Sequence, residues 1–429
     1  MRFALFAALL WMGQALAAPV AVVPVEGAIG PATADFVRRA IEHAATDGTQ
    51  LVVLRIDTPG GLDSAMREII KAILASPVPV ASFVAPSGAR AASAGTFILY
   101  ASHFAAMAPG TNLGAASPVS LIGGGATDKE GKKTEDTMTK KVTNDAVAYI
   151  RGFAQLRGRN ADWGEQAVRE GVSLPAEEAR KLKVIDLIAA DVPALIKKLD
   201  GKTVEAGGAK RTLQLADAAV QELQADWRTR FLAVITNPSV AYLLVLLGAY
   251  GLLFEFMNPG LVMPGVVGVI ALLIAAYALH LLPVNYAGLA LMLLGIGFMV
   301  AEAFLPAYGS LGIGGLIAFV LGSIMLIEET NLPGLDIPLA LIAGVAAASA
   351  GFLIFVLGML VRGRKRPVVS GREHMIGASG EALEDFEGEG WARVRGESWR
   401  VRTAGPVRRG ERLRVTAMHG LVLTVEVDR

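Results

Sequence analysis

The stretch LVVLRIDTPGGLDSAMREIIKAILAS, residues 51–76, decides the fold of the first half of the chain. Its first seven residues are rich in Val, Leu and Ile, which is typical of a strand buried on both faces. The strand ends at Asp57, and the turn residues Thr58-Pro59-Gly60-Gly61 follow it. Residues 62–76 then carry apolar side chains at helical spacing. We therefore predict one strand-turn-helix unit of a parallel sheet.

The same alternation extends on both sides of this unit. Two further Val-rich runs are typical of strands, and amphipathic stretches between them predict helices. Residues 121–140 are rich in glycine and in charges of both signs, so we predict a surface loop there. Residues 19–230 are thus expected to form an α/β domain with helices on both faces of the sheet. The predicted elements are strands at 20–25 and 78–86, helices at 32–45 and 141–156, and a strand, helix and strand within 172–188.

Composition indicates that another part of the chain lies in a membrane. Of the 429 residues, 53% are hydrophobic and 18% are charged, whereas a soluble domain carries about 25% charged residues. The net charge of +1 gives no basic field that would attract nucleic acid. The absence of cysteine excludes disulfides, thiolate metal sites and a cysteine nucleophile.

Residues 1–18, MRFALFAALLWMGQALAA, are typical of a secretory signal peptide. One arginine precedes a short apolar run, and small residues flank a cleavage point after Ala17 or Ala18. The alternative is an uncleaved anchor helix, although the run is short for a bilayer core of about 30 Å.

Five apolar segments between residues 238 and 361 are predicted to span the membrane. A cleaved signal peptide would place residues 19–230 outside, and five spans would bring the C-terminus inside. Arg362, Arg364 and Arg366 follow the last span, as expected on the cytoplasmic side, whereas Arg228 and Arg230 before the first span oppose this rule. The five segments are 240–256, 266–282, 287–305, 311–327 and 337–361.

The last part of the chain, residues 372–429, is polar. Apolar and polar residues alternate in WARVRGESWRVR, residues 391–402, and in RLRVTAMHGLVLTVEV, residues 412–427. Period-two alternation in short strands separated by glycines predicts a small β-barrel.

Two features of the α/β domain have the residue types that acyl-transfer chemistry requires. Gly60 and Gly61 follow a strand end, where backbone N–H groups can bind an anion, although an ordinary tight turn would use the same residues. Ser93 precedes an apolar helical stretch, so its hydroxyl would lie at a helix N-terminus. The alternative is that Ser93 is only a helix cap.

A serine nucleophile needs a base, and several residues are candidates. His43 lies in a charged helix, which favours a solvated side chain, whereas a triad based on His103 stays open. Lysine serves as a base only as the neutral amine. Lys140 and Lys141 begin the helix after the charged loop; the helical wheel does not choose between them, and both would otherwise be solvated surface residues. The buried face of that helix is predicted to hold Val142, Ala146, Tyr149, Ile150 and Phe153.

At this point the chain resembles the long form of the NfeD family, membrane-bound serine proteases also called stomatin-operon-partner proteases. The resemblance covers nearly the whole mature chain, with the motifs in the same order. One departure is the loop at 121–140, which is longer and more charged than the family suggests. The matching motifs include Asp57-Thr-Pro-Gly-Gly61, Ala92-Ser-Ala-Gly-Thr96, Met107-Ala-Pro-Gly-Thr111, Lys141-Val-Thr-Asn144, Gly158-Arg-Asn160 and Met375-Ile-Gly377.

The resemblance implies a ClpP/crotonase-like fold for the exported domain and an OB-fold for the C-terminal domain. It implies Ser93 as nucleophile and Lys141 as base, because Val-Thr-Asn follows Lys141 and not Lys140. The oxyanion hole would use the N–H groups of Gly61 and Ala94, and Gly60 would contact substrate. The family also implies a stomatin- or prohibitin-like membrane partner with a hydrophobic cleavage site, and a homo-oligomer in the bacterial inner membrane. No metal is expected, because no His/Asp/Glu cluster with ligand spacing appears in the sequence, and no cofactor is expected.

Two other functions compete with this one. The chain would be a non-catalytic scaffold if the exported domain only bound a partner, and an acyl-CoA enzyme if crotonase chemistry applied; the signal peptide argues against the second. Small apolar residues from Ala91 to Phe97, with Val84, predict walls that favour an apolar substrate, unless they only pack the fold. Glu255 and Glu302, near the ends of apolar spans, have either an interfacial position or an ion or proton role.

Overall fold

The computed structural model describes residues 18–118, 137–305, 309–327, 336–364 and 372–428. The predicted signal peptide, except its last residue, and most of the predicted loop at 121–140 lie outside the described residues. The chain divides into two compact units, Met1–Ser349 and Ala350–Arg429.

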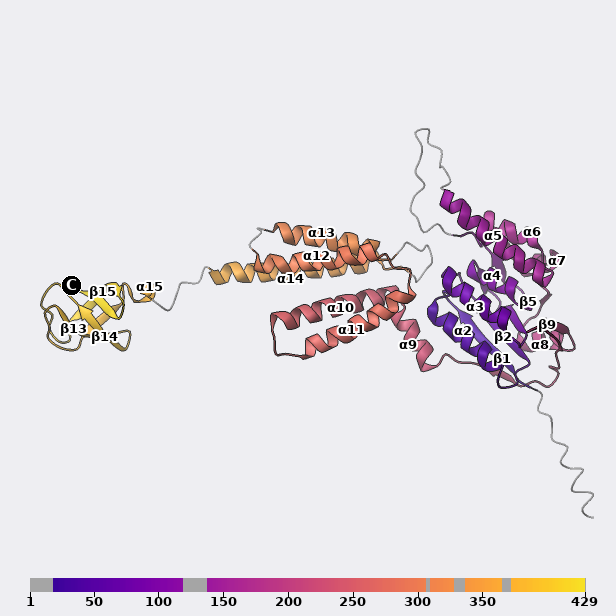
Figure 1. Cartoon of the computed structure of the whole chain (residues 1–429), viewed down its shortest axis with the longest axis horizontal. Coiled ribbons are helices and arrows are strands. Elements are labelled where there is room, and N and C mark those ends of the chain that lie inside the picture. The colour runs from indigo at the N-terminus through magenta and orange to yellow at the C-terminus, as the bar shows by residue number, and fades with distance from the viewer. Residues whose placement is uncertain (1–17, 119–136, 306–308, 328–335, 365–371, 429) are drawn as a thin grey trace, which may run out of the picture. The chain divides into compact units, whose positions relative to one another are not determined.

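A six-stranded parallel sheet forms the centre of the α/β domain (Figure 1). Along β2, Val52, Leu54 and Ile56 pack on one face with α2 (Pro31–Ala44), α3 (Asp63–Ala75) and α4 (Ala94–Ala101). Leu51 and Val53 pack on the other face with α8 (Val192–Leu199). Both faces are thus covered, as predicted. The strand order is β11 (Val220–Glu222), β1 (Val20–Glu26), β2 (Leu51–Asp57), β3 (Val80–Val84), β5 (Phe104–Met107) and β8 (Leu187–Ile188).

A second, three-stranded sheet follows the end of β2. It contains β4 (Arg90–Ala92), β6 (Asn112–Gly114) and β7 (Ser173–Pro175), and a bridge between Thr58 and Ala91 joins it to the residue after β2. The strand that precedes Ser93 therefore lies beside the residue that follows β2. Further elements of the domain are α6 (Ala161–Arg169), α7 (Ala176–Lys181) and the hairpin of β9 (Thr203–Ala206) and β10 (Ala209–Thr212).

Helix α5 (Thr137–Arg157) corrects two predictions. It begins at Thr137, so residues 137–140 are helical and do not belong to the predicted loop. Ala146, Ile150 and Phe153 are buried as predicted, but Val142 is 46% exposed. The buried face therefore begins one turn later than the apolar pattern indicates, because the first turns of α5 extend beyond the domain core.

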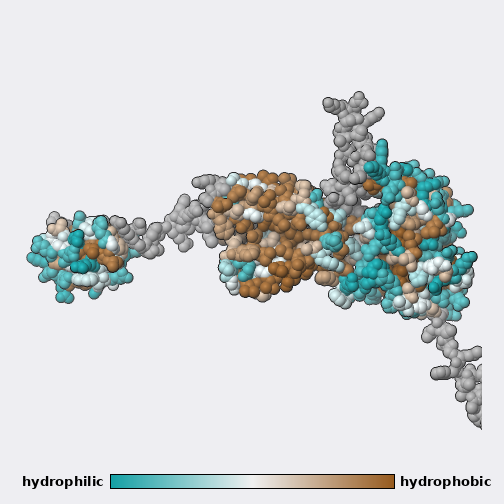
Figure 2. Space-filling model, viewed as in Figure 1, coloured by the Kyte–Doolittle hydropathy of each residue, from teal (hydrophilic) through white to brown (hydrophobic). Residues whose placement is uncertain are grey.

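Five apolar helices occupy the five segments predicted from hydropathy, and Figure 2 shows their apolar surface in brown. Two of them, Pro238–Met257 and Met263–Leu281, are long and apolar enough to cross a membrane, whereas the apolar parts of the other three, Tyr286–Glu302, Ser310–Met325 and Leu339–Phe355, are shorter. The helices are α10 (Pro238–Met257), α11 (Met263–Leu281), α12 (Tyr286–Phe304), α13 (Ser310–Met325) and α14 (Leu339–Arg364).

Helices α10–α11 and α12–α13 are two copies of one helical hairpin. Their key residues lie 47 positions apart: Gly248 and Gly295, Glu255 and Glu302, Gly265 and Gly312, Gly268 and Gly315. A Cβ on Gly248 would lie 3.0 Å from the carbonyl oxygen of Gly268, and a Cβ on Gly295 would lie 2.5 Å from that of Gly315. Glycine at matching positions lets the two helices of each hairpin approach closely.

In each hairpin a glutamate, Glu255 or Glu302, binds backbone N–H groups at or before the start of the second helix. Glu302 is buried and accepts hydrogen bonds from the N–H groups of Gly309, Leu311 and Gly312 at 2.8, 3.1 and 3.1 Å. Glu255 Oε1 accepts from Gly260 at 3.4 Å and from Val262 at 3.1 Å. Each carboxylate thus binds backbone N–H groups at or just before the next helix, where the helix dipole favours negative charge. In Glu302 both carboxylate oxygens accept such bonds, whereas Glu255 Oε2 is buried without a hydrogen-bond partner among the described residues.

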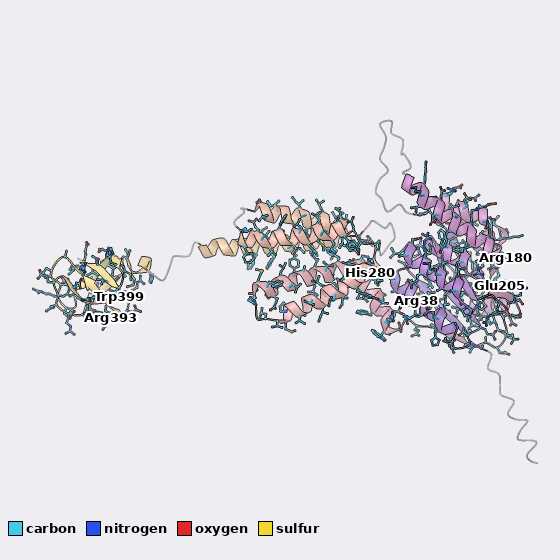
Figure 3. All side chains as sticks on the ribbon, in the orientation of Figure 1. Arg38, Arg180, Glu205, His280, Arg393 and Trp399 are labelled. Carbon is cyan, nitrogen blue, oxygen red and sulfur yellow. The ribbon has the colours of Figure 1, made fainter. Side chains whose placement is uncertain are left out.

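The second unit contains a closed five-stranded barrel, as the period-two pattern predicts. On β13, Ala392 and Val394 are buried while Arg393 between them is exposed. Figure 3 labels Arg393 and, on β14, Trp399, which packs against the barrel core. The barrel order is β12 (Ser379–Ala382), β13 (Glu389–Val394), β14 (Glu397–Arg402), β16 (Val422–Val427) and β15 (Arg412–His419), preceded by α15 (Arg372–Met375).

Candidate active site

Ser93 lies between β4 and α4 in a strained backbone conformation. Its φ and ψ are 51° and −113°, a region that residues with a Cβ rarely occupy. Ser93 is the N-cap of α4, yet its side chain makes no capping hydrogen bond. The simple cap interpretation is therefore wrong, since the hydroxyl does not serve the helix. The backbone is held by the Ser93 N–H, which donates to Gly114 O at 3.0 Å.

The glycine pair after β2 lies directly against Ser93. A Cβ on Gly60, whose φ is +123°, would lie 2.8 Å from Ser93 Cβ and 3.2 Å from its Oγ. A Cβ on Gly61 would lie 2.1 Å from the carbonyl oxygen of Ile29. Both positions thus require glycine for space, and Gly60 also for its backbone angle. Of the two glycines, Gly60 thus lies against Ser93 and Gly61 against Ile29.

Two buried threonines that sequence reasoning missed hold this arrangement. Thr58 Oγ1 accepts from the N–H of Gly60 at 3.0 Å and donates to Gly27 O at 2.7 Å. Thr96 Oγ1 donates to Ala91 O at 2.8 Å and accepts from the N–H of Gly114 at 3.1 Å. Thr58 lies one residue after β2, and Thr96 lies in the first turn of α4. A search of the sequence for nucleophiles and bases does not single out either threonine.

Two backbone donors near Ser93 are unoccupied. Within the described part of the chain, the N–H groups of Gly61 and Ala94 make no hydrogen bond. Ala94 begins α4, where the helix dipole favours negative charge, and Gly61 is half-buried. An arrangement of free N–H groups beside a serine hydroxyl can stabilise the oxyanion of a tetrahedral intermediate.

The predicted base is placed less closely. Lys141 lies in the second turn of α5 with an exposed side chain. Among the described residues, no hydrogen bond joins Lys141 to Ser93. The structure therefore brings Ser93 together with the glycine pair but shows no contact between Ser93 and its predicted base.

Arg67, which sequence reasoning did not single out, ties the helix of Lys141 to the helix after the glycine pair. From α3, Arg67 binds Asp63 at 2.8 Å and Asp145 of α5 at 2.6 Å. Its guanidinium also lies 4.5 Å from the ring centre of Tyr149, a cation–π contact. The Tyr149 ring lies 6.3 Å from that of Phe97 on α4. Helices α3, α4 and α5 thus meet at Arg67 and Tyr149.

The histidines do not reach Ser93. His43 is exposed and pairs with Asp47, as predicted for a solvated residue. His103 is buried and follows the C-terminal end of α4, whereas Ser93 caps its N-terminal end. An eight-residue helix is about 12 Å long. The His103 triad left open by the sequence is therefore excluded by position.

We expect His103 to make the α/β domain less stable in acid. Burial, and then Arg157 and Arg159, lowers the pKa of His103 from 6.5 to about 3. Below pH 6.5 the unfolded chain binds a proton that the folded chain excludes, so stability falls as the pH drops towards 3. Urea unfolding of residues 19–230 at a series of pH values measures this slope. In His103→Gln the slope should flatten by about 1 kcal/mol per pH unit; an unchanged slope would contradict the assignment.

Arg159 supports α4 from its C-terminal end. It is buried, and Nη1 donates to the carbonyl oxygens of Leu99, Tyr100 and Ser102 at 3.0, 2.8 and 2.9 Å. Nη2 binds Asp186 at 2.7 Å. A cation on the final carbonyls stabilises the helix that carries Ser93. The only sequence signal was its place in the Gly158-Arg-Asn160 motif.

The apolar wall predicted from sequence is part of the core. Val84, Ala91 and Phe97 are all buried. They pack between the sheet and its helices, so the simpler interpretation of these residues holds. In the described part of the chain no cluster of three or more His, Asp or Glu side chains is arranged to hold a metal ion.

Three family models match this chain. NfeD1b, N-terminal domain, matches residues 19–222; NfeD integral membrane domain matches 239–359; and NfeD-like C-terminal, partner-binding domain, matches 372–426. The chain is 36% identical over 422 residues to the membrane-bound protease PH1510 of Pyrococcus horikoshii, which covers 96% of this chain and 93% of the relative. It is 29% identical over 309 residues to membrane protein NfeD1b of Bacillus subtilis, covering 70% of this chain and 65% of the relative.

Two solved structures are similar to the α/β domain. One is the N-terminal domain of a membrane protease specific for a stomatin homologue from P. horikoshii, 34% identical over 51% of this chain and 98% of that chain, with a TM-score of 0.43. The other is a lysine-to-alanine variant of a membrane-bound stomatin-specific protease with a substrate peptide, 35% identical over 51% of this chain and 97% of that chain, with a TM-score of 0.45.

Fold and matches together define a membrane protein with an α/β domain before its apolar helices and a β-barrel after them. More specifically, the chain belongs to the NfeD family.

Proposed function

We propose that the protein is a membrane-bound serine endopeptidase in which Ser93 is the nucleophile and Lys141 the base. The observation that carries this proposal is the state of Ser93, a strained serine whose hydroxyl caps nothing, beside two unoccupied N–H groups. Strain of this kind is stored at functional sites. The name of PH1510, a membrane-bound protease at 36% identity, supports the same class of enzyme.

The chemistry follows from these groups. Neutral Lys141 takes the proton of Ser93 Oγ, and Oγ bonds to the scissile carbonyl carbon. The electron pair moves to the carbonyl oxygen, which accepts hydrogen bonds from Gly61 and Ala94; one such donor contributes about 3–4 kcal/mol. The C–N bond then breaks, and the amine leaves with the proton from Lys141. Water, activated by Lys141, hydrolyses the ester and returns the proton to Ser93. The first step requires Lys141 Nζ within hydrogen-bond distance of Ser93 Oγ.

We assign the ClpP/crotonase-like fold to residues 19–230, five membrane spans to 238–361 and an OB-fold to 372–429. Residues 1–18 are assigned as a signal peptide, so that the α/β domain lies outside the bacterial inner membrane and the barrel in the cytoplasm. Helices in all five predicted segments support this arrangement. The homo-oligomer implied by the family belongs to the same proposal.

This arrangement predicts opposite sides for the two soluble domains. Alkaline phosphatase fused after Asp226 should be active, because it would be exported, whereas the same enzyme fused to residue 429 should be inactive in the cytoplasm. A green fluorescent protein should give the reverse pattern and serves as the control. Equal behaviour of both fusion points would mean an even number of spans.

The proposed substrate is a hydrophobic segment of a stomatin- or prohibitin-like membrane protein. The description of residues 372–426 as a partner-binding domain supports such a partner. The exposed Val142 beside Lys141 supports an apolar segment, and so does the position of the site in a membrane protein.

Replacing apolar residues beside the cut by Asp or Lys should therefore reduce hydrolysis. We expect kcat/KM to fall at least about tenfold per charge, because each apolar side chain contributes about 1–3 kcal/mol in such a site. A peptide series with Leu, Val or Phe replaced on either side of the cut measures this preference, with a replacement distant from the cut as the control. Values within a few-fold across the series would refute the preference without touching the Ser93 mechanism.

A scaffold function is the second candidate. The exposed Lys141, with no bond to Ser93, is the observation that favours it. A scaffold would retain its partner and hydrolyse nothing, and would not react with a fluorophosphonate. Labelling of wild type but not of Ser93→Ala would exclude the scaffold.

A further inference from the structure

A short amphipathic helix, α9 (Trp227–Ile235), connects the α/β domain to the apolar helices. Trp227, Phe231 and Val234 are 75%, 46% and 57% exposed. At 3.6 residues per turn these three side chains lie within an arc of about 60°. The buried residues form another face of the same helix and are Thr229, Leu232 and Ile235.

Helix α9 is fixed to the α/β domain by a network of charged groups. Arg39 of α2 donates through Nη1 and Nη2 to the carboxylate of Asp226, at 2.9 and 3.2 Å, and also to Thr229 Oγ1 at 2.8 Å. Asp226 caps α9 by accepting from the Thr229 N–H at 2.8 Å. Arg228 pairs with Asp35 of α2 at 3.5 Å. Because α2 also packs against α3, whose N-terminus follows the glycine pair, α9 is tied to the framework of the site.

The exposed face of α9 is continuous with the membrane segment. Only Thr236 and Asn237 separate α9 from α10, and Asn237 caps α10 by accepting from Ser239 at 3.0 Å. The matched N-terminal domain ends at residue 222 and the matched membrane domain begins at 239, so α9 belongs to neither. An apolar face so close to the start of a membrane helix cannot lie far from the bilayer.

We propose that α9 lies along the surface of the bilayer, with Trp227, Phe231 and Val234 inserted into the interfacial region. Tryptophan is enriched at that depth, and amphipathic helices bind there through their apolar face. The exposed Arg230 then contacts anionic headgroups, while Arg228 stays paired with Asp35 of α2. Both arginines, which oppose the positive-inside rule, thus have a partner at the membrane surface or on α2. Given the proposed protease function, α9 holds Ser93 at a fixed height above the membrane.

The absence of cysteine from the chain makes depth measurement straightforward. Phe231→Cys and Val234→Cys in the full chain are labelled with a nitroxide and reconstituted in vesicles of phosphatidylethanolamine and phosphatidylglycerol. Ala233→Cys, exposed on the same helix outside the apolar arc, is the matched control. We expect collisions with oxygen, relative to a water-soluble nickel chelate, to be at least about threefold more frequent at 231 and 234 than at 233.

Two results would overturn the proposal. Equal accessibility of all three labels to the nickel chelate would place the face in water. Shielding of 231 and 234 from both reagents, with spin–spin broadening, would mean that a second copy of the chain covers it. Neither result depends on catalysis, so a failure of the protease mechanism would leave this measurement valid.

A cleavage assay tests whether α9 acts as a membrane anchor. In Trp227→Asp/Phe231→Asp, cleavage of a substrate embedded in the bilayer should fall about tenfold, while cleavage of a short soluble peptide stays unchanged. Leu156→Asp/Leu182→Asp, at exposed leucines of the α/β domain, is the control and should lower neither rate. An equal loss on both substrates would contradict an anchoring role.

Discussion

Ser93→Ala should lower kcat/KM for peptide hydrolysis by at least about a thousandfold, because in the proposed mechanism Ser93 forms the acyl-enzyme. Lys141→Ala should have a similar effect, since the proposed base would be missing. In this mechanism the two residues act as one unit, so the double variant should lose no more than either single variant. Steady-state assays of the full chain in detergent or vesicles measure all three.

Two matched variants control for indirect effects. Ser87→Ala removes an exposed serine from the loop before β4, and Lys140→Ala removes the neighbouring lysine of α5. Both should keep near wild-type activity, and circular dichroism should show that every variant is folded. Substantial turnover by a folded Ser93→Ala protein would refute the mechanism, and an active Lys141→Ala with an inactive Lys140→Ala would move the base by one residue.

Gly60→Ala should both inactivate and destabilise the protein. Its Cβ would lie 2.8 Å from Ser93 Cβ, and its φ of +123° is strained for any residue with a side chain. We expect the free energy of unfolding to fall by about 3 kcal/mol and hydrolysis to fall with it, because Ser93 must move. Gly61→Ala should cost at least as much, since its Cβ would meet the backbone oxygen of Ile29 at 2.1 Å.

Gly88→Ala separates the effect of backbone strain from the effect of the contact with Ser93. Gly88 has a φ of +90°, but a Cβ there would meet nothing within 4 Å. Alanine at this position should therefore cost only about 1 kcal/mol of conformational strain and leave activity unchanged. Chemical denaturation and peptide assays compare the variants. Equal losses of stability and activity in Gly60→Ala and Gly88→Ala would show that the contact with Ser93 has no effect beyond backbone strain.

The main elements were predictable because they follow from hydrophobic periodicity. The Val-rich run at 51–57 is buried on both sides, so composition alone indicated a strand covered on two faces. The start of α5 was not predictable, because residues 137–140 precede the apolar pattern from which the helix was predicted. Hydrophobic periodicity reflects which side chains are buried. A helical turn that buries few side chains therefore shows no clear apolar pattern in the sequence.

The sequence indicated only those site residues whose type and immediate neighbours suggest a role. Gly60, Gly61 and Ser93 stand out by residue type, whereas Thr58, Arg67 and Arg159 act through contacts with Gly27, Asp145 and Tyr100, which are distant in the chain. Apolar residues near Ser93 misled in the opposite direction. Val84 and Phe97 suggested a substrate wall, but both side chains are buried in the core of the domain.

The paired hairpins α10–α11 and α12–α13 have a consequence for the evolution of the chain's topology. In the five-span arrangement proposed above, each 47-residue copy enters and leaves on one side, so gaining or losing a whole copy leaves the side of the C-terminal barrel unchanged. Only α14 belongs to neither hairpin copy, and it alone makes the number of spans odd. Duplication could thus enlarge the membrane segment without ever placing the barrel on the wrong side of the bilayer.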